Sequence, residues 1–89
     1  MLEREIEITN KLGLHARAAA RLVKVAGGFT SSIEIEKQDQ RVNAKSIMSV
    51  MMLAASRGNT VKLFVEGDDQ TDAMSAVTEL IENKFGEDE

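Results

Sequence analysis

The sequence contains no cysteine, no tryptophan, no tyrosine and only one histidine. Without cysteine it can form neither disulfide bonds nor a thiolate nucleophile. One histidine without cysteine also cannot build a usual zinc site. The composition therefore predicts a protein with no metal and no other cofactor.

Positive charge and aromatic rings are also scarce. The formal net charge is −4 at pH 7 and the only aromatic residues are three phenylalanines, whereas nucleic-acid binding needs basic surfaces and stacking rings. No apolar segment approaches the roughly 20 residues that cross a bilayer, and the N-terminus does not show the basic and apolar regions of a signal peptide. We expect a cytoplasmic protein that neither binds nucleic acid nor inserts into a membrane.

The rest of the composition is typical of a folded globular domain. Of the 89 residues, 43% are hydrophobic and 29% are charged. Because so short a chain has room for only one modest core, we expect a single domain over residues 1–89, present as a monomer.

Alternating apolar and polar residues predict four strands. They cover residues 2–8, 31–36, 41–43 and 60–66. The second and third are close enough to form a hairpin. In the last strand Val61, Leu63 and Val65 point inward, which leaves Phe64 pointing outward.

Apolar residues at helical spacing predict a first helix over residues 16–26, with Arg17, Arg21 and Lys24 on a separate stripe. We expect Gly27 and Gly28 to end this helix in the left-handed conformation.

Ser46 is a good N-cap residue for a second helix that begins at Ile47 and ends near Gly58. If Ile47, Val50, Leu53 and Ala54 face the core, then three methionines of this helix lie partly outside it. They are Met48, Met51 and Met52.

Asp68 or Asp69 introduces the last helix, in which Ala73, Val77, Leu80 and Ile81 face the core. Lys84 and Gly86 close this helix. We expect the final residues 87–89 to fray.

The predicted order is βαββαβα, and the helices are long enough to cover only one face of the sheet. The fold class is therefore α+β: an open-faced two-layer sandwich with a four-stranded antiparallel sheet covered on one face by three helices.

His15 is the strongest candidate for chemistry. It stands at the predicted start of a helix, where unpaired N–H groups and the helix dipole favour a phosphate group. An ordinary imidazole is largely neutral near pH 7 and can attack phosphorus. Arg17 can reach the phosphoryl oxygens, and Gly13 lets the backbone approach closely. From spacing alone, an ordinary surface histidine beside a solvated arginine is the favoured interpretation.

Two motifs resemble those of a known family. Gly13-Leu14-His15-Ala16-Arg17 and Lys45-Ser46-Ile47-Met48, at this separation, closely resemble the histidine-containing phosphocarrier proteins (HPr) of the bacterial phosphotransferase system and their nitrogen-type relatives (NPr). The resemblance covers essentially the whole chain. Many family members have proline after the arginine, where this chain has Ala18. Ser49 stands where glycine is common.

The resemblance implies a phosphocarrier that is not a turnover catalyst. Enzyme I, with phosphoenolpyruvate as ultimate donor, would phosphorylate Nδ1 of His15. Arg17 would stabilise the phosphoryl group, which would then pass to an EIIA domain. The output would be sugar transport or, as in NPr, mainly regulation.

The resemblance also implies a regulatory site and a partner surface. Ser46 matches the serine that HPr kinase/phosphorylase modifies in some bacteria, although N-capping alone accounts for a serine here. The three methionines, which could equally be core filler, would join an apolar patch ringed by positive charge. The implied partner-binding residues are Ala20, Arg21, Lys24, Lys45, Ile47, Met48, Met51 and Met52.

Two other functions stay open. The chain could be an interaction module whose binding alone controls a target, or a small-molecule regulatory domain of similar α+β pattern. The presence of His15 argues against the interaction module as the only role.

Overall fold

Four strands form one antiparallel sheet in the computed structural model of the protein, which describes residues 1–88. The strands are β1 (Leu2–Glu7), β2 (Ser32–Lys37), β3 (Gln40–Asn43) and β4 (Thr60–Glu66), in the spatial order β1-β4-β2-β3. All neighbouring pairs are antiparallel. The predicted hairpin joins β2 and β3. Its turn residues Gln38 and Asp39 have φ angles of 50° and 67°, which suit the twist of a tight hairpin.

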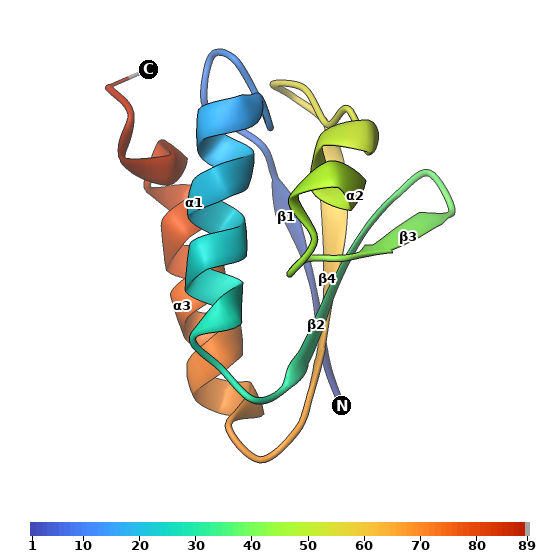
Figure 1. The fold of residues 1–89 in the computed structure, drawn as a ribbon. Coiled ribbons are helices and arrows are strands. Elements are labelled where there is room, and N and C mark those ends of the chain that lie inside the picture. Colours follow the sequence, from blue (N-terminus) through green and yellow to red (C-terminus); the bar gives the residue numbers. More distant parts are fainter. Residues whose placement is uncertain (89) are drawn as a thin grey trace.

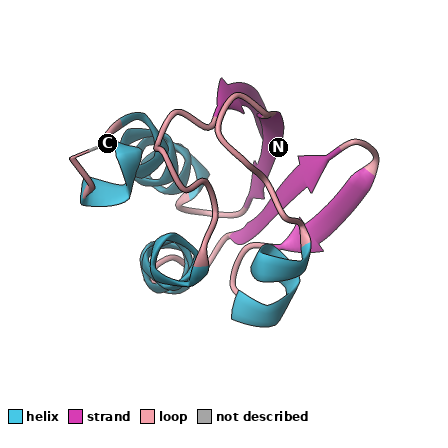
Figure 2. Ribbon diagram, turned by 90° about the horizontal axis from the view of Figure 1, so that it is seen from above, coloured by secondary structure: helices cyan, strands magenta, loops and turns pink. Residues whose placement is uncertain are grey.

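Three helices lie on one face of this sheet (Figures 1 and 2). They are α1 (Ala16–Gly27), α2 (Ile47–Met52) and α3 (Gln70–Glu82), and a short 3₁₀ turn, η1 (Lys84–Gly86), follows α3. The predicted α+β open-faced sandwich is therefore confirmed. No helix within residues 1–88 is long and apolar enough to cross a membrane.

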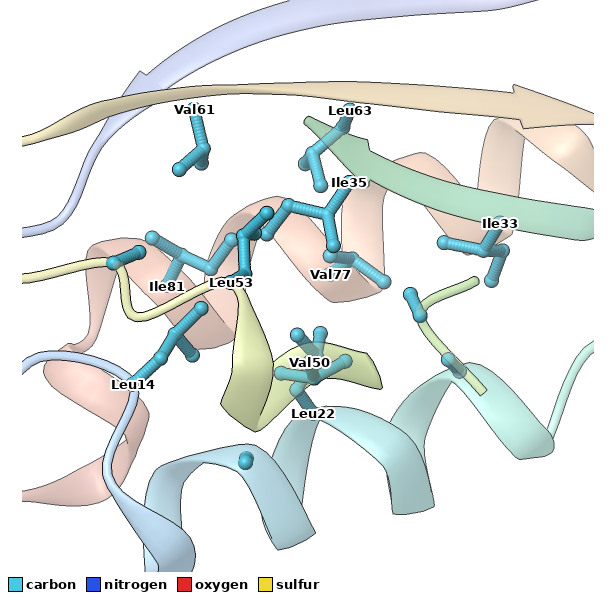
Figure 3. Packing of buried hydrophobic residues seen from close by; sticks show 14 of the residues in the cluster. Leu14, Leu22, Ile33, Ile35, Val50, Leu53, Val61, Leu63, Val77 and Ile81 are labelled. Carbon is cyan, nitrogen blue, oxygen red and sulfur yellow. The ribbon is translucent and has the colours of Figure 1, made fainter. Parts of the chain in front are cut away.

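The core fills the space between the helices and the sheet (Figure 3). Every helix contributes to it, through Leu22 of α1, Val50 of α2 and Val77 of α3, and each of these side chains is fully buried. Phe64 lies outside this cluster, as the alternation of β4 predicted. The guanidinium group of Arg41 covers its ring, 3.6 Å from the ring centroid.

The ends of two helices differ from the prediction. Gly27 is still helical and Gly28 has a φ of −78°, so neither adopts the left-handed conformation. Instead α1 ends in a tight turn, in which the Gly28 N–H donates to the Val25 carbonyl at 3.1 Å.

The second helix is shorter than predicted, because α2 ends at Met52 and Leu53 caps it. Ala54 then takes a left-handed φ of 54°, which redirects the chain so that the Ala55 carbonyl accepts a hydrogen bond from the Leu14 N–H at 2.9 Å. Ile47 and Ala54 are exposed, so two of the four apolar residues considered for the core lie outside it. Val50 and Leu53 are buried as expected.

The expectation of a frayed C-terminus was wrong for Glu87. Phe85, two residues earlier, is fully buried. The Glu87 carboxylate is held at 2.9 Å by the side-chain amide of Asn10, from the loop after β1. Asp88 is exposed, and Glu89 lies outside the described residues.

Candidate functional site

His15 is the N-cap residue of α1. Its backbone is extended, with φ −73° and ψ 178°, and its carbonyl accepts the Ala19 N–H at 2.8 Å. Its side chain makes no capping hydrogen bond and is 27% exposed. The imidazole is therefore accessible beside the first N–H groups of a helix, where an anion is stabilised.

Gly13 positions the loop that delivers His15. It has a φ of 62°, and a Cβ atom at this residue would lie 2.5 Å from the Ala55 carbonyl oxygen and 2.8 Å from the Ser56 Cα. The close backbone approach predicted for Gly13 is present, and the backbone that it approaches is the loop between α2 and β4. The His15 loop is thus fixed against a segment about forty residues further along the chain, at Ala55 and Ser56.

Arg17 lies in the first turn of α1 and is exposed. It has no hydrogen-bond or ion-pair partner among residues 1–88, so its guanidinium group is available to an incoming anion. His15 and Arg17 line an open depression of about 680 Å³. The other lining residues are Lys11, Leu12, Ala16, Arg21, Gly86, Glu87 and Asp88.

Ala18 occupies the position where many family members have proline. It is fully buried, and α1 is regular from Ala16 onward. Alanine is the best helix former, which accounts for the regular first turn without proline.

Sequence reasoning missed Glu87, which is the only hydrogen-bond partner of the His15 side chain among the described residues. One carboxylate oxygen lies 2.5 Å from Nε2 of His15. The hydrogen bond from the Asn10 side chain, and less strongly the interaction with His15, lower the pKa of Glu87. Nothing in the sequence separates Glu87 from the other acidic residues at the C-terminus, so no local signal could have found it.

Ser46 caps α2 as predicted. Its hydroxyl oxygen accepts the Ser49 N–H at 3.3 Å, and the Ser46 hydroxyl donates to the Ser49 hydroxyl oxygen at 3.0 Å. A serine at position 49 therefore supplies the capping hydroxyl with a second partner. This contact gives Ser49 a structural role that a glycine cannot have.

The apolar residues of α2 that were expected at a partner surface are exposed. Met48 and Met52 are 68% and 70% exposed, so the interpretation of these methionines as core filler is wrong. Met51 and Ile47 are about two-fifths exposed, and Leu12, which was not predicted, is 66% exposed.

The other residues implied at the partner surface differ in how available their side chains are. Ala20 and Lys24 are exposed. Arg21 donates to the Phe85 carbonyl, and the Lys45 ammonium group donates to the Phe29 carbonyl at 2.8 Å. Arg17 and Lys24 are therefore the more available cations, and Arg21 and Lys45 also hold the fold together.

Among residues 1–88 no group of three or more histidine, cysteine, aspartate or glutamate side chains could hold a metal ion.

An open-faced α+β sandwich that presents an accessible histidine and an exposed arginine at the start of its first helix defines a class of small phosphocarrier proteins. A family model described as the phosphotransferase system (PTS) HPr component phosphorylation site matches residues 2–83. The phosphocarrier protein HPr of Cupriavidus necator is 53% identical over 89 residues, which is all of both chains. The chain belongs to the HPr family of the phosphotransferase system.

Solved structures agree with this assignment. The crystal structure of HPr from Thermoanaerobacter tengcongensis, described as HPr-C-His, has 55% identity, covers all of both chains and superposes with a TM-score of 0.96. A second structure from that organism, described as an HPr dimer, has 56% identity and a TM-score of 0.79, and covers 98% of this chain and 100% of that one.

Proposed function

We propose that this protein accepts a phosphoryl group on Nδ1 of His15 from phosphorylated enzyme I and passes it to an EIIA domain. The observation that carries the proposal is the placement of His15: a partly exposed imidazole at the N-cap of α1, beside an exposed arginine that has no partner among residues 1–88. The protein acts in the cytoplasm as a monomer and is itself the substrate of other enzymes.

The transfer is a displacement at phosphorus. The Nδ1 lone pair of His15 forms the new N–P bond, while the bond between phosphorus and the donor breaks and its electron pair leaves with the donor. The first N–H groups of α1 and the Arg17 guanidinium stabilise the negative charge on the phosphoryl oxygens. Because the N–P bond is labile, a second displacement passes the group on: a nucleophile of the EIIA domain attacks phosphorus, and the electron pair of the N–P bond returns to Nδ1.

The exposed residues of α1 and α2 form the docking surface in this proposal. Met48 and Met52 supply flexible apolar area that adapts to more than one partner, and Arg17 and Lys24 supply positive charge for acidic partners. Phosphorylation of Ser46 by HPr kinase/phosphorylase would add negative charge next to this surface and weaken docking without unfolding α2.

The test is incubation with enzyme I and labelled phosphoenolpyruvate, comparing the protein with His15→Ala. We expect label on the parent protein only, and the label should be acid-labile and base-stable, as a phosphoramidate is. Circular dichroism establishes that the variant is folded. A parent protein that takes no label from a demonstrably active enzyme I would support the interaction module, a function without phosphoryl transfer.

A further inference from the structure

The C-terminal segment returns to the start of α1 and is anchored there (Figure 1). Lys84, Phe85 and Gly86 have left-handed φ angles of 54°, 56° and 79°, a conformation that is costly for residues other than glycine. Two features hold the segment in place. The Phe85 side chain is fully buried, and Arg21 donates a hydrogen bond to the Phe85 carbonyl. The segment is thus fixed where Glu87 faces the imidazole.

Both carboxylate oxygens of Glu87 are engaged. One accepts the Asn10 side-chain N–H at 2.9 Å, and the other lies 2.5 Å from Nε2 of His15. The lowered pKa of Glu87 keeps this group ionised near neutral pH, and an ionised carboxylate can only accept hydrogen bonds. Nε2 of His15 must therefore carry the hydrogen, which leaves the lone pair of the neutral ring on Nδ1.

We propose that Glu87 is a positioning residue that holds the His15 ring with Nε2–H toward the C-terminal segment and the Nδ1 lone pair free for phosphorus. The inference rests on the proposed function, because it assigns a role within that transfer. When Nδ1 forms the N–P bond the ring becomes more positive, and the carboxylate at Nε2–H stabilises that charge. The Nε2 proton stays in place throughout, so no proton needs to enter or leave the ring.

The charges around the depression are compatible with this role. Arg17, Arg21 and Lys11 line it together with Glu87 and Asp88. The carboxylate of Glu87 engages the ring at Nε2, so Nδ1 is left for the phosphoryl group in a depression that these cations also line. The arrangement resembles in principle the carboxylate that orients the histidine of a serine protease triad.

The first arm of the test observes the ring directly. His15 is the only histidine in the chain, so its ring nitrogens give unambiguous ¹⁵N and ¹H NMR signals. At about pH 8.5, where an ordinary imidazole is neutral, we expect the parent protein to show the Nε2–H tautomer with a slowly exchanging Nε2 proton. Glu87→Ala should speed that exchange and shift the ring ¹⁵N signals, and Glu87→Gln should have a smaller effect.

A matched control comes from the end of α3. Glu82 is exposed, and Glu82→Gln makes the same change in charge as Glu87→Gln at a residue outside the depression. We expect the Glu82→Gln spectrum to match that of the parent.

The second arm measures the rate of phosphoryl transfer from phosphorylated enzyme I in a single turnover. We expect Glu87→Ala to slow the transfer about tenfold, the lower end of the loss seen when the carboxylate that orients a metal-bound histidine is removed, and Glu82→Gln to leave it within about twofold.

The outcomes separate the two proposals. Unchanged His15 signals in Glu87→Ala, or changed signals with an unchanged transfer rate, would overturn the role of Glu87 while the proposed function stands. A parent protein that accepts no phosphoryl group would contradict the proposed function, and the spectra would still report whether Glu87 holds the ring.

Discussion

At residue 13, backbone conformation and packing both require glycine. The left-handed φ of 62° is unfavourable for alanine, and its Cβ would overlap the backbone of Ala55 and Ser56. We expect Gly13→Ala to lower the free energy of unfolding by about 1–3 kcal/mol, and to slow phosphorylation because the loop that positions His15 must shift. Urea unfolding measures the first effect.

Gly27 is a suitable control for this substitution. It is the last residue of α1, and a Cβ there meets no atom within 4 Å. Because alanine is favoured over glycine in a helix, we expect Gly27→Ala to raise the free energy of unfolding by up to about 1 kcal/mol. Equal stability of Gly13→Ala and the parent would show that the loop relaxes without cost.

Between elements, Asp69 ties the start of α3 to the loop before β2. Its carboxylate accepts the N–H groups of Thr30 and Ser31, each at 2.9 Å, and the Ser31 hydroxyl at 2.5 Å. These hydrogen bonds, the Ser31 hydroxyl first, lower the pKa of Asp69 from 3.8 to about 2. Asp69 was predicted only to introduce the helix. In the structure it makes no capping bond and instead joins two segments distant in sequence.

The lowered pKa of Asp69 predicts how stability depends on pH. A carboxylate whose pKa is lower in the folded protein stabilises the fold above its unfolded value, and this contribution is lost as pH falls toward the folded value. Asp69→Asn should therefore lower the Tm at pH 7, since an amide has only one acceptor oxygen, and the difference from the parent should shrink between about pH 4 and pH 2.

Thermal unfolding at several pH values tests this, with Asp68→Asn as the control, because Asp68 is an exposed neighbour. If the Tm difference between Asp69→Asn and the parent stayed constant down to pH 2, the stabilising role of the ionised Asp69 carboxylate would be contradicted.

The elements show what could be predicted from the sequence. Alternation identified all four strands and the outward Phe64, because strand periodicity directly reports which face is buried. The motif around His15 is local, so its place at a helix start was also predictable. The end of α2 and the position of Glu87 were not, because they depend on contacts between Ala55 and Leu14 and between Glu87 and Asn10, which are far apart in sequence.

Across the whole molecule, charge is distributed unevenly. The net charge is −4, and β1 exposes Glu3, Glu5 and Glu7. By contrast, α1 exposes Arg17 and Lys24. Because screening limits exposed charges to a range of about 8–10 Å, an acidic partner docked on α1 should respond to the local cations more than to the net charge.

Two substitutions that change the net charge equally can test this. Lys24→Gln and Thr71→Glu both change it from −4 to −5. Lys24 lies in the last turn of α1, within the docking surface, whereas Thr71 is exposed in the first turn of α3, outside that surface. An acidic residue in the first turn of α3 also suits the helix dipole. We expect Lys24→Gln to raise the KM of enzyme I for this protein about two- to threefold and to weaken its salt dependence, since a charge at the rim of an interface acts mainly on association.

Thr71→Glu should leave the KM of enzyme I unchanged, because its added charge lies on α3, outside the exposed residues of α1 and α2 that form the docking surface, and salt screens exposed charges. Steady-state phosphorylation by enzyme I at two ionic strengths gives the KM for both variants and its salt dependence. If Thr71→Glu raised the KM as much as Lys24→Gln, the net charge of the molecule would govern docking, and the exposed Lys24 of α1 would have no special part in partner recognition.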